Sequence, residues 1–327
     1  MVIAESPLKD VWRRLVWGPF RQAAEAAPPT WEARVVRAMG RAAAQAMPSK
    51  LGQVRTNMQR GLGPRADLET LARQTFATHF GNQYIGFLFG KCDARTWPRY
   101  LEIQGLHHLE QARAQGRGVV LMHPHMGPAQ LPLHVLGVRG YPMHQVGGGQ
   151  VTEVQFSKTG QWAVQTRASL EQRIQATLHD GGRFLRPILR ALENNEIIMS
   201  ACDGTGGGTE LGRRLVRPVL GQPVGVPVGP IWMALQAKAP LLTVRCVRHR
   251  RPSGPSGERQ DGGEGQALFL AEIGPPVEFE RGQGKAAAFE SGADAIAAYL
   301  SQSLSAWPGD WHFWDYFEPG RLIEGER

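Results

Sequence analysis

The stretch that most constrains the fold runs from Gly116 to Gln130, where a short apolar run ends on histidines. Val119 to Met122 are four consecutive apolar residues after a glycine-rich turn, a pattern typical of a buried strand. His123 and His125 follow at once, and Gly127-Pro128 interrupt the chain before an apolar pattern resumes. The polar side chains therefore lie where a strand ends and a helix begins. Because ligands in an open α/β sheet bind at the carboxyl ends of the strands, an imidazole there is a candidate general base.

A second stretch has the same order of features. Ile197 to Met199 read as a buried strand, Asp203 falls at its carboxyl end, and glycines follow from Gly204. If the two strands belong to one parallel sheet, His125 and Asp203 reach the same edge of it. Three arginines come next, and guanidinium groups bind phosphate well. The three residues are Arg213, Arg214 and Arg217, and they are also compatible with an ordinary solvent-exposed surface.

The chain of 327 residues is expected to be α/β, with a central, mostly parallel sheet flanked by helices. We expect residues 1–100 to form a helical N-terminal extension packed on the core, and residues 101–327 to form the α/β domain. Apolar residues at helical spacing predict helices over 31–46, 66–90 and 285–306, two helical segments within 168–195 broken at Gly181-Gly182, and a hairpin of strands 241–247 and 267–273. The aromatic end, Trp307 to Phe317, is expected to pack against the core.

Charge and composition limit the partners. The formal net charge is +8, which favours anionic partners such as an anionic membrane face or an acidic carrier protein. The aromatic residues are not interleaved with Lys and Arg as a nucleic-acid platform requires. Cys92, Cys202 and Cys246 are far apart, and with no secretory leader they indicate reduced core thiols in a cytoplasmic protein.

No segment of the sequence is long and apolar enough to span a membrane, so work on a membrane implies binding from its surface. Residues 8–26 place Trp12, Leu15, Val16 and Phe20 near one side, with arginines beside or opposite them. Such a pattern is typical of a helix that lies in the headgroup layer of a membrane. It is equally typical of an ordinary amphipathic helix docked on the protein core.

These residues resemble the lysophospholipid acyltransferase superfamily, and most of all its branch of lipid A late acyltransferases. The likeness runs from about Leu101 to Phe317. His125-Met-Gly-Pro-Ala-Gln130 occupies the family's His-x-x-x-x-acid motif, and Asp203-Gly-Thr205 resembles its later acidic-Gly-Thr block. Trp311-His-Phe-Trp314 resembles its aromatic C-terminal signature.

The resemblance implies a glycerol-3-phosphate acyltransferase-like fold and a peripheral enzyme on the cytoplasmic, inner face of the bacterial cell membrane. His125 would deprotonate a hydroxyl of a lysophospholipid or glycolipid acceptor, which attacks an acyl thioester of acyl carrier protein or coenzyme A. That thioester is a co-substrate, and neither a cofactor nor a metal is expected. Asp203 would orient the acceptor or the histidine. Candidate substrate-binding residues are His123, Gly127, Gly204, Thr205, Arg213 and Arg214.

One departure from the family pattern bears on catalysis. The fifth residue after the histidine is an acid in the family and is Gln130 here. A neutral amide still orients the imidazole but does not stabilise the imidazolium that forms during proton transfer. Either Asp203 or another acid takes this role, or the activity is slow, altered or absent.

Two other hypotheses stay open at this point. His123 and His125 at a strand end, with further histidines nearby, suit a metal-dependent hydrolase, although no Glu or Cys lies beside them at metal-ligand spacing. Gln130 suits a catalytically weak or inactive homologue that binds lipid or acyl carrier.

Overall fold

The centre of the protein is a seven-stranded sheet. A computed structural model describes residues 7–147, 156–181, 185–203, 212–249 and 267–324. The strand order is β1-β9-β8-β2-β5-β3-β4, and every neighbouring pair is parallel except the antiparallel pair β8–β9. The strands are β1 (Leu101–Gln104), β2 (Val119–His123), β3 (Met143–Gly147), β4 (Thr177–Asp180), β5 (Ile197–Ala201), β8 (Leu241–Arg248) and β9 (Phe269–Ile273). The predicted sheet and the predicted hairpin of its last two strands are confirmed.

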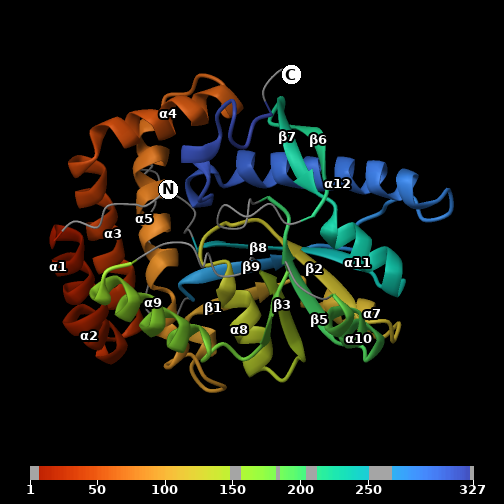
Figure 1. Ribbon diagram of the computed structural model, residues 1–327, viewed down its shortest axis with the longest axis horizontal. Coiled ribbons are helices and arrows are strands. Elements are labelled where there is room, and N and C mark those ends of the chain that lie inside the picture. The colour runs from red at the N-terminus through yellow and green to blue at the C-terminus, as the bar shows by residue number, and fades with distance from the viewer. Residues whose placement is uncertain (1–6, 148–155, 182–184, 204–211, 250–266, 325–327) are drawn as a thin grey trace, which may run out of the picture.

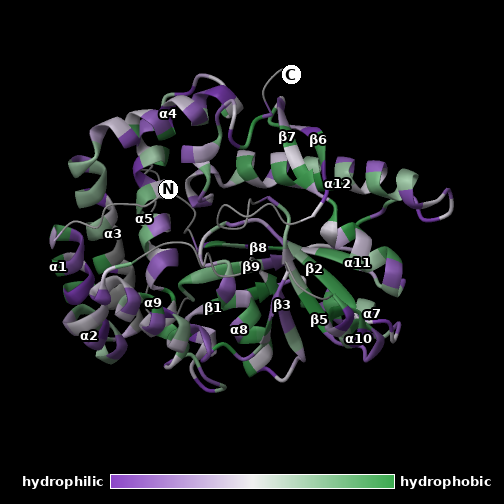
Figure 2. Cartoon of the chain, in the orientation of Figure 1, coloured by the Kyte–Doolittle hydropathy of each residue, from purple (hydrophilic) through white to green (hydrophobic). Residues whose placement is uncertain are grey.

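Helices cover both faces of this sheet (Figure 1). They are α7 (Leu106–Arg113), α8 (Gln130–Val138), α10 (Arg186–Glu193), α11 (Gly229–Ala237) and α12 (Lys285–Ala306), whereas α9 (Lys158–Glu171) packs on helices of the N-terminal segment. Alternate residues of β2 enter different core clusters: Val120 and Met122 pack on one face, Val119 and Leu121 on the other. All four are buried, since neither face of a helix-covered sheet meets water. Figure 2 shows the same concentration of hydrophobic residues in the central strands.

The N-terminal segment is helical and lies at one side of the sheet (Figure 1). Its elements are α1 (Pro7–Leu15), a π-helical turn (Val16–Phe20), α2 (Arg21–Ala26), α3 (Pro29–Ala46), α4 (Pro48–Leu62), α5 (Leu68–Tyr84), α6 (Gly86–Phe89) and a 3₁₀ turn (Trp97–Arg99). The Thr78 hydroxyl donates to the Gly309 carbonyl at 2.9 Å, and the Asn57 amide donates to the Trp314 carbonyl at 2.8 Å. These bonds join the first helices to the C-terminal segment. The division into two domains at residue 100 stays a prediction.

The C-terminal segment and a small hairpin complete the described chain. Strands β6 (Arg214–Val219) and β7 (Gln222–Pro227) pair antiparallel as a separate two-stranded sheet, and 3₁₀ turns cover Pro308–Asp310 and Trp314–Tyr316. Trp314 and Phe317 are fully buried, so the predicted packing of the aromatic end against the core is confirmed.

Two predictions of local structure were wrong or incomplete. Of the two helical segments predicted within residues 168–195, the second is the helix α10, whereas the first is only the end of α9 followed by the strand β4. β4 is an edge strand with exposed or half-buried residues, so no buried apolar pattern distinguished it; its pairing with β3 makes it a strand. The region between the two predicted N-terminal helices is itself the helix α4, which begins at Pro48, a residue favoured in the first turn of helices.

Candidate active site

His125 and Asp203 come together because their strands are parallel neighbours. In the pairing of β2 with β5, His123 lies opposite Ala201, and the Cys202 N–H donates to the His123 carbonyl at 2.9 Å. His125 lies two residues beyond His123, and Asp203 lies two residues beyond Ala201. The two side chains therefore lie side by side at the carboxyl edge of the sheet. This is the edge at which open α/β folds bind ligands.

Three hydrogen bonds hold the Asp203 carboxylate. Its Oδ1 accepts from the His125 Nδ1–H at 2.7 Å, and its Oδ2 accepts from the His125 backbone N–H at 2.7 Å and from the Trp311 Nε1–H at 2.7 Å. The Asp203 side chain is 1% exposed, whereas the His125 side chain is 29% exposed. A buried carboxylate thus fixes one nitrogen of the ring, and Nε2 of a solvent-accessible imidazole is left to exchange a proton with a substrate.

The electrostatics of the pair suit proton transfer. Burial alone would lower the pKa of His125, but the negative charge of Asp203 and its hydrogen bond outweigh burial and raise the pKa above 6.5. Burial would likewise raise the pKa of Asp203, but the His125 charge and the bonds from His125 and Trp311 outweigh it and lower that pKa. The carboxylate therefore stays ionised beside the imidazole through the neutral pH range.

The C-terminal segment forms a wall of the site. Met126 and Trp311 form an antiparallel bridge, and the Gly127 N–H donates to the Asp310 carbonyl at 2.8 Å. The Phe313 ring lies 4.8 Å from the His125 ring, measured between centroids. The contact of Trp311 with Asp203 was missed by sequence reasoning, because nothing in the aromatic run indicates which ring reaches the carboxylate.

His312 supports the backbone of this wall. Its N–H donates to the His125 carbonyl at 3.0 Å, and its ring Nε2–H donates to the Gly127 carbonyl at 2.7 Å. Burial, followed by the charges of His125 and His79, lowers the pKa of His312 to about 3. This imidazole is therefore neutral and positions the loop that carries His125.

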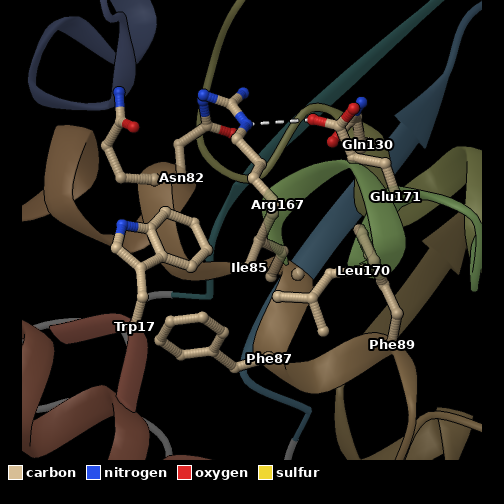
Figure 3. A pocket seen from close by; sticks show the side chains of 11 residues that line it. Trp17, Asn82, Ile85, Phe87, Phe89, Gln130, Arg167, Leu170 and Glu171 are labelled. Atoms are coloured by element: carbon tan, nitrogen blue, oxygen red, sulfur yellow. Dashed lines mark hydrogen bonds and ion pairs between the residues drawn. The ribbon is translucent and has the colours of Figure 1, made fainter. Parts of the chain in front are cut away.

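Gln130 does not face the histidine. It is the first residue of α8 and lines a small cavity with Trp17, Arg167 and Glu171, as Figure 3 shows. Within the described part of the chain no hydrogen bond joins Gln130 to His125, whose Nδ1 is already bonded to Asp203. The side chain hydrogen-bonded to the His125 ring is therefore Asp203 and not Gln130.

His123 and Gly127 flank the pair in different ways. Burial, then the charge of His125, lowers the pKa of His123 to about 4, so this ring is neutral; its Nδ1–H donates to the Pro124 carbonyl at 3.2 Å. Its centroid lies 5.5 Å from that of His125. Gly127 has φ +50°, and a Cβ there would lie 2.6 Å from the Cys246 carbonyl oxygen, so the turn requires glycine. Neither observation tests substrate binding by these two residues.

The other candidate residues are Gly204, Thr205, Arg213 and Arg214. Gly204 and Thr205 fall outside the described residues. Arg213 is exposed and lines a cavity of about 530 Å³ with Lys285, its guanidinium 5.9 Å from the centroid of the Phe289 ring. Arg214 begins β6. Their predicted binding roles stay untested.

Two other kinds of site, a metal centre and a cysteine nucleophile, were also considered for this edge of the sheet. Among the described residues no group of three or more His, Cys, Asp or Glu side chains is arranged to hold a metal ion. Cys202 is fully buried, and burial raises the pKa of its thiol well above its ordinary value, so it remains a protonated core residue rather than a nucleophile.

Residues 19–314 match the family model of the bacterial lipid A biosynthesis acyltransferases. A search of curated protein sequences found no significant match.

Proposed function

We propose that this chain, which belongs to the bacterial lipid A biosynthesis acyltransferase family and is therefore an acyltransferase, uses His125 as its general base. The proposed acyl donor is a thioester of acyl carrier protein or coenzyme A. The proposed acceptor is a hydroxyl group of a glycolipid, a lysophospholipid or a related lipid.

The reaction assigns one task to each member of the site. Nε2 of His125 removes the proton of the acceptor hydroxyl as its oxygen attacks the thioester carbonyl carbon. The tetrahedral intermediate then breaks the carbon–sulfur bond, and the departing thiolate takes the proton back from the imidazolium. Asp203 stabilises that imidazolium, and Trp311 holds Asp203 in place. No acyl-enzyme intermediate and no resident cofactor are needed.

The observation that carries this proposal is the pair of His125 and Asp203, one accessible and one buried, at the carboxyl edge of the sheet. The experiment is a screen by mass spectrometry in which the protein is incubated with panels of acyl thioesters and hydroxylated lipids. We expect a lipid product whose mass has increased by one acyl group. If no donor and acceptor pair yields such a product above the level of heat-denatured protein, the proposed reaction is wrong.

We also propose that α1 docks the enzyme on an anionic membrane surface. Its polar residues face the protein: Asp10 accepts from the Ser157 hydroxyl at 2.7 Å, and the Arg14 guanidinium donates to the Thr159 hydroxyl at 3.3 Å. Its apolar residues face outward, with exposures of 78% (Leu8), 54% (Val11), 51% (Trp12) and 52% (Leu15). These four are spaced as one side of a helix.

The orientation of α1 is the reverse of that of an ordinary docked helix, and it matches an interfacial helix. The whole chain carries a net charge of +8, which attracts anionic headgroups. In the described chain there is no helix with the length and hydropathy of a transmembrane span.

Substitution of Val11→Ser with Leu15→Ser is expected to weaken vesicle binding at least tenfold. Each apolar side chain withdrawn from water contributes on the order of 1.5–3 kcal/mol. Co-sedimentation with vesicles of phosphatidylethanolamine and phosphatidylglycerol measures the change. The matched control, Val216→Ser with Leu178→Ser, replaces exposed residues of the same types elsewhere and should bind normally. Equal vesicle binding by the unmodified protein, the Val11/Leu15 variant and the control variant would contradict the proposal that α1 docks on the membrane.

A catalytically weak homologue remains the alternative, and Gln130→Glu tests it. We expect the rate of acyl transfer to change less than about threefold, since the new carboxylate would lie beside Glu171 and not beside His125, whose Nδ1 is bonded to Asp203. Gln130→Ala serves as the matched control for loss of the amide. A gain of tenfold or more with glutamate would show that Asp203 does not replace the acid of the motif.

A further inference from the structure

The wall of the active site is attached to the N-terminal helix α5. The 3₁₀ turn Pro308–Asp310, which directly precedes Trp311, packs on this helix (Figure 1). Gln74 and Thr78 lie four residues apart on α5, so their side chains share one face of the helix. The contacts of both side chains show that this face meets the turn.

Two hydrogen bonds join this face of α5 to the turn. The Thr78 hydroxyl donates to the Gly309 carbonyl at 2.9 Å, and the Gln74 amide donates to the Asp310 carboxylate at 3.3 Å. Gly309 packs so closely on Gln74 that a Cβ at position 309 would lie 2.5 Å from the Gln74 Cδ. Thr78 is buried, so removal of its hydroxyl would leave the Gly309 carbonyl buried without this donor.

The residues that follow Gly309 hold the catalytic pair. Trp311 donates its indole N–H to Asp203 at 2.7 Å. His312 donates its backbone N–H to the carbonyl of His125 at 3.0 Å. The carbonyl held by α5 therefore lies within three residues, along the chain, of both donors to the pair. The turn is buried and close-packed, so a displacement of Gly309 is transmitted to these donors.

We propose that Thr78 is a positioning residue for acyl transfer, whose hydroxyl fixes the turn that holds Asp203 and the loop of His125. The proposal rests on the function proposed above, in which His125 is the base. Among the residues that the structure describes, no hydrogen bond joins α5 to either member of the pair, so Thr78 acts through the turn. A misplacement of about 1 Å caused far from the reacting atoms can cost about 10²-fold in rate.

Thr75 supplies a matched control on the same helix. Thr75 and Thr78 are each 5% exposed, and the Thr75 hydroxyl donates at 3.2 Å to the Leu71 carbonyl within α5. Thr75→Val and Thr78→Val therefore each remove one buried hydroxyl and one hydrogen bond, but only Thr78→Val releases the turn. Their melting temperatures should fall by similar amounts. Thr78→Ser keeps the hydroxyl and should behave nearly as the unmodified protein.

Hydrogen exchange measured by NMR on the full chain reports on the wall without any substrate. The reporters are the Gly127 backbone N–H, which donates to a carbonyl of the turn, and the Trp311 indole N–H. We expect both to exchange about tenfold faster or more in Thr78→Val, and at nearly normal rates in Thr75→Val and Thr78→Ser. No acceleration in Thr78→Val, or equal acceleration in both valine variants, would overturn the proposal.

Steady-state acyl transfer separates positioning from substrate binding. Thr78→Val is expected to lower kcat about 10- to 100-fold, with KM for thioester and lipid changed less than about threefold, whereas Thr75→Val should keep a normal kcat. Faster exchange with an unchanged kcat also overturns the proposal, because the wall would then move without affecting the pair. If the unmodified protein transfers no acyl group, the proposed function is wrong, and the exchange rates alone decide whether Thr78 holds the wall.

Discussion

Replacement of His125 by alanine is expected to lower the rate of acyl transfer by about 10²- to 10⁴-fold, the range that a positioned general base contributes. The variant loses Nε2, the one ring nitrogen that Asp203 does not hold. It keeps the backbone N–H that donates to Oδ2 of Asp203, so the loop retains one of its bonds. The rate of product formation by mass spectrometry, with thioester and lipid at saturation, measures the effect.

A matched variant separates lost chemistry from lost structure. His107 lies on α7, is exposed and has no part in the site, so His107→Ala should transfer acyl groups at the normal rate. The melting temperature of His125→Ala should fall, because the buried Asp203 carboxylate loses one of its three hydrogen bonds, but the variant should still unfold in one cooperative transition well above the assay temperature. Transfer that survives His125→Ala with less than a tenfold loss would contradict the assignment of this residue as the base.

The meeting of His125 and Asp203 illustrates what the sequence made predictable. Two apolar runs, each ending on a polar residue, indicated parallel strands, and the carboxyl ends of parallel strands share an edge. β2 and β5 are direct neighbours in register, so the two side chains are brought within hydrogen-bonding distance. Periodicity and strand direction carried this prediction, and neither depends on details of packing.

The rest of the site depends on tertiary contacts that a local pattern does not encode. Trp311 lies 108 residues after Asp203 and reaches it only because Met126 and Trp311 form a bridge. The motif spacing suggested that Gln130 would face His125, yet spacing does not fix the direction of a side chain at the start of a helix. The edge strand β4 went unrecognised for a related reason, since its pairing with β3, rather than its own residues, makes it a strand.

Asp203→Asn tests the carboxylate at constant shape, and we expect the rate of acyl transfer to fall by about 10³- to 10⁴-fold. In the Ser-His-Asp triad the equivalent change lowers kcat about 10⁴-fold because the histidine adopts the wrong tautomer. The same reasoning applies here. An asparagine oxygen can accept from Trp311 and the His125 backbone, which leaves its NH₂ group facing Nδ1 of His125. Nδ1 must then accept, and Nε2 carries the proton it should remove from the substrate.

The pH profile distinguishes this electrostatic role from a structural one. The base is active when neutral, so the rate should rise with pH through the pKa of His125, which Asp203 holds above 6.5. Without the negative charge, burial prevails and lowers that pKa, so the acid limb of Asp203→Asn should move to lower pH while its plateau falls. The control is Asp294→Asn, which removes a carboxylate that forms an ion pair with Arg217. It should change neither the plateau rate nor the position of the acid limb. A reduced plateau with an unmoved acid limb would show that Asp203 acts on the fold and not on the imidazole.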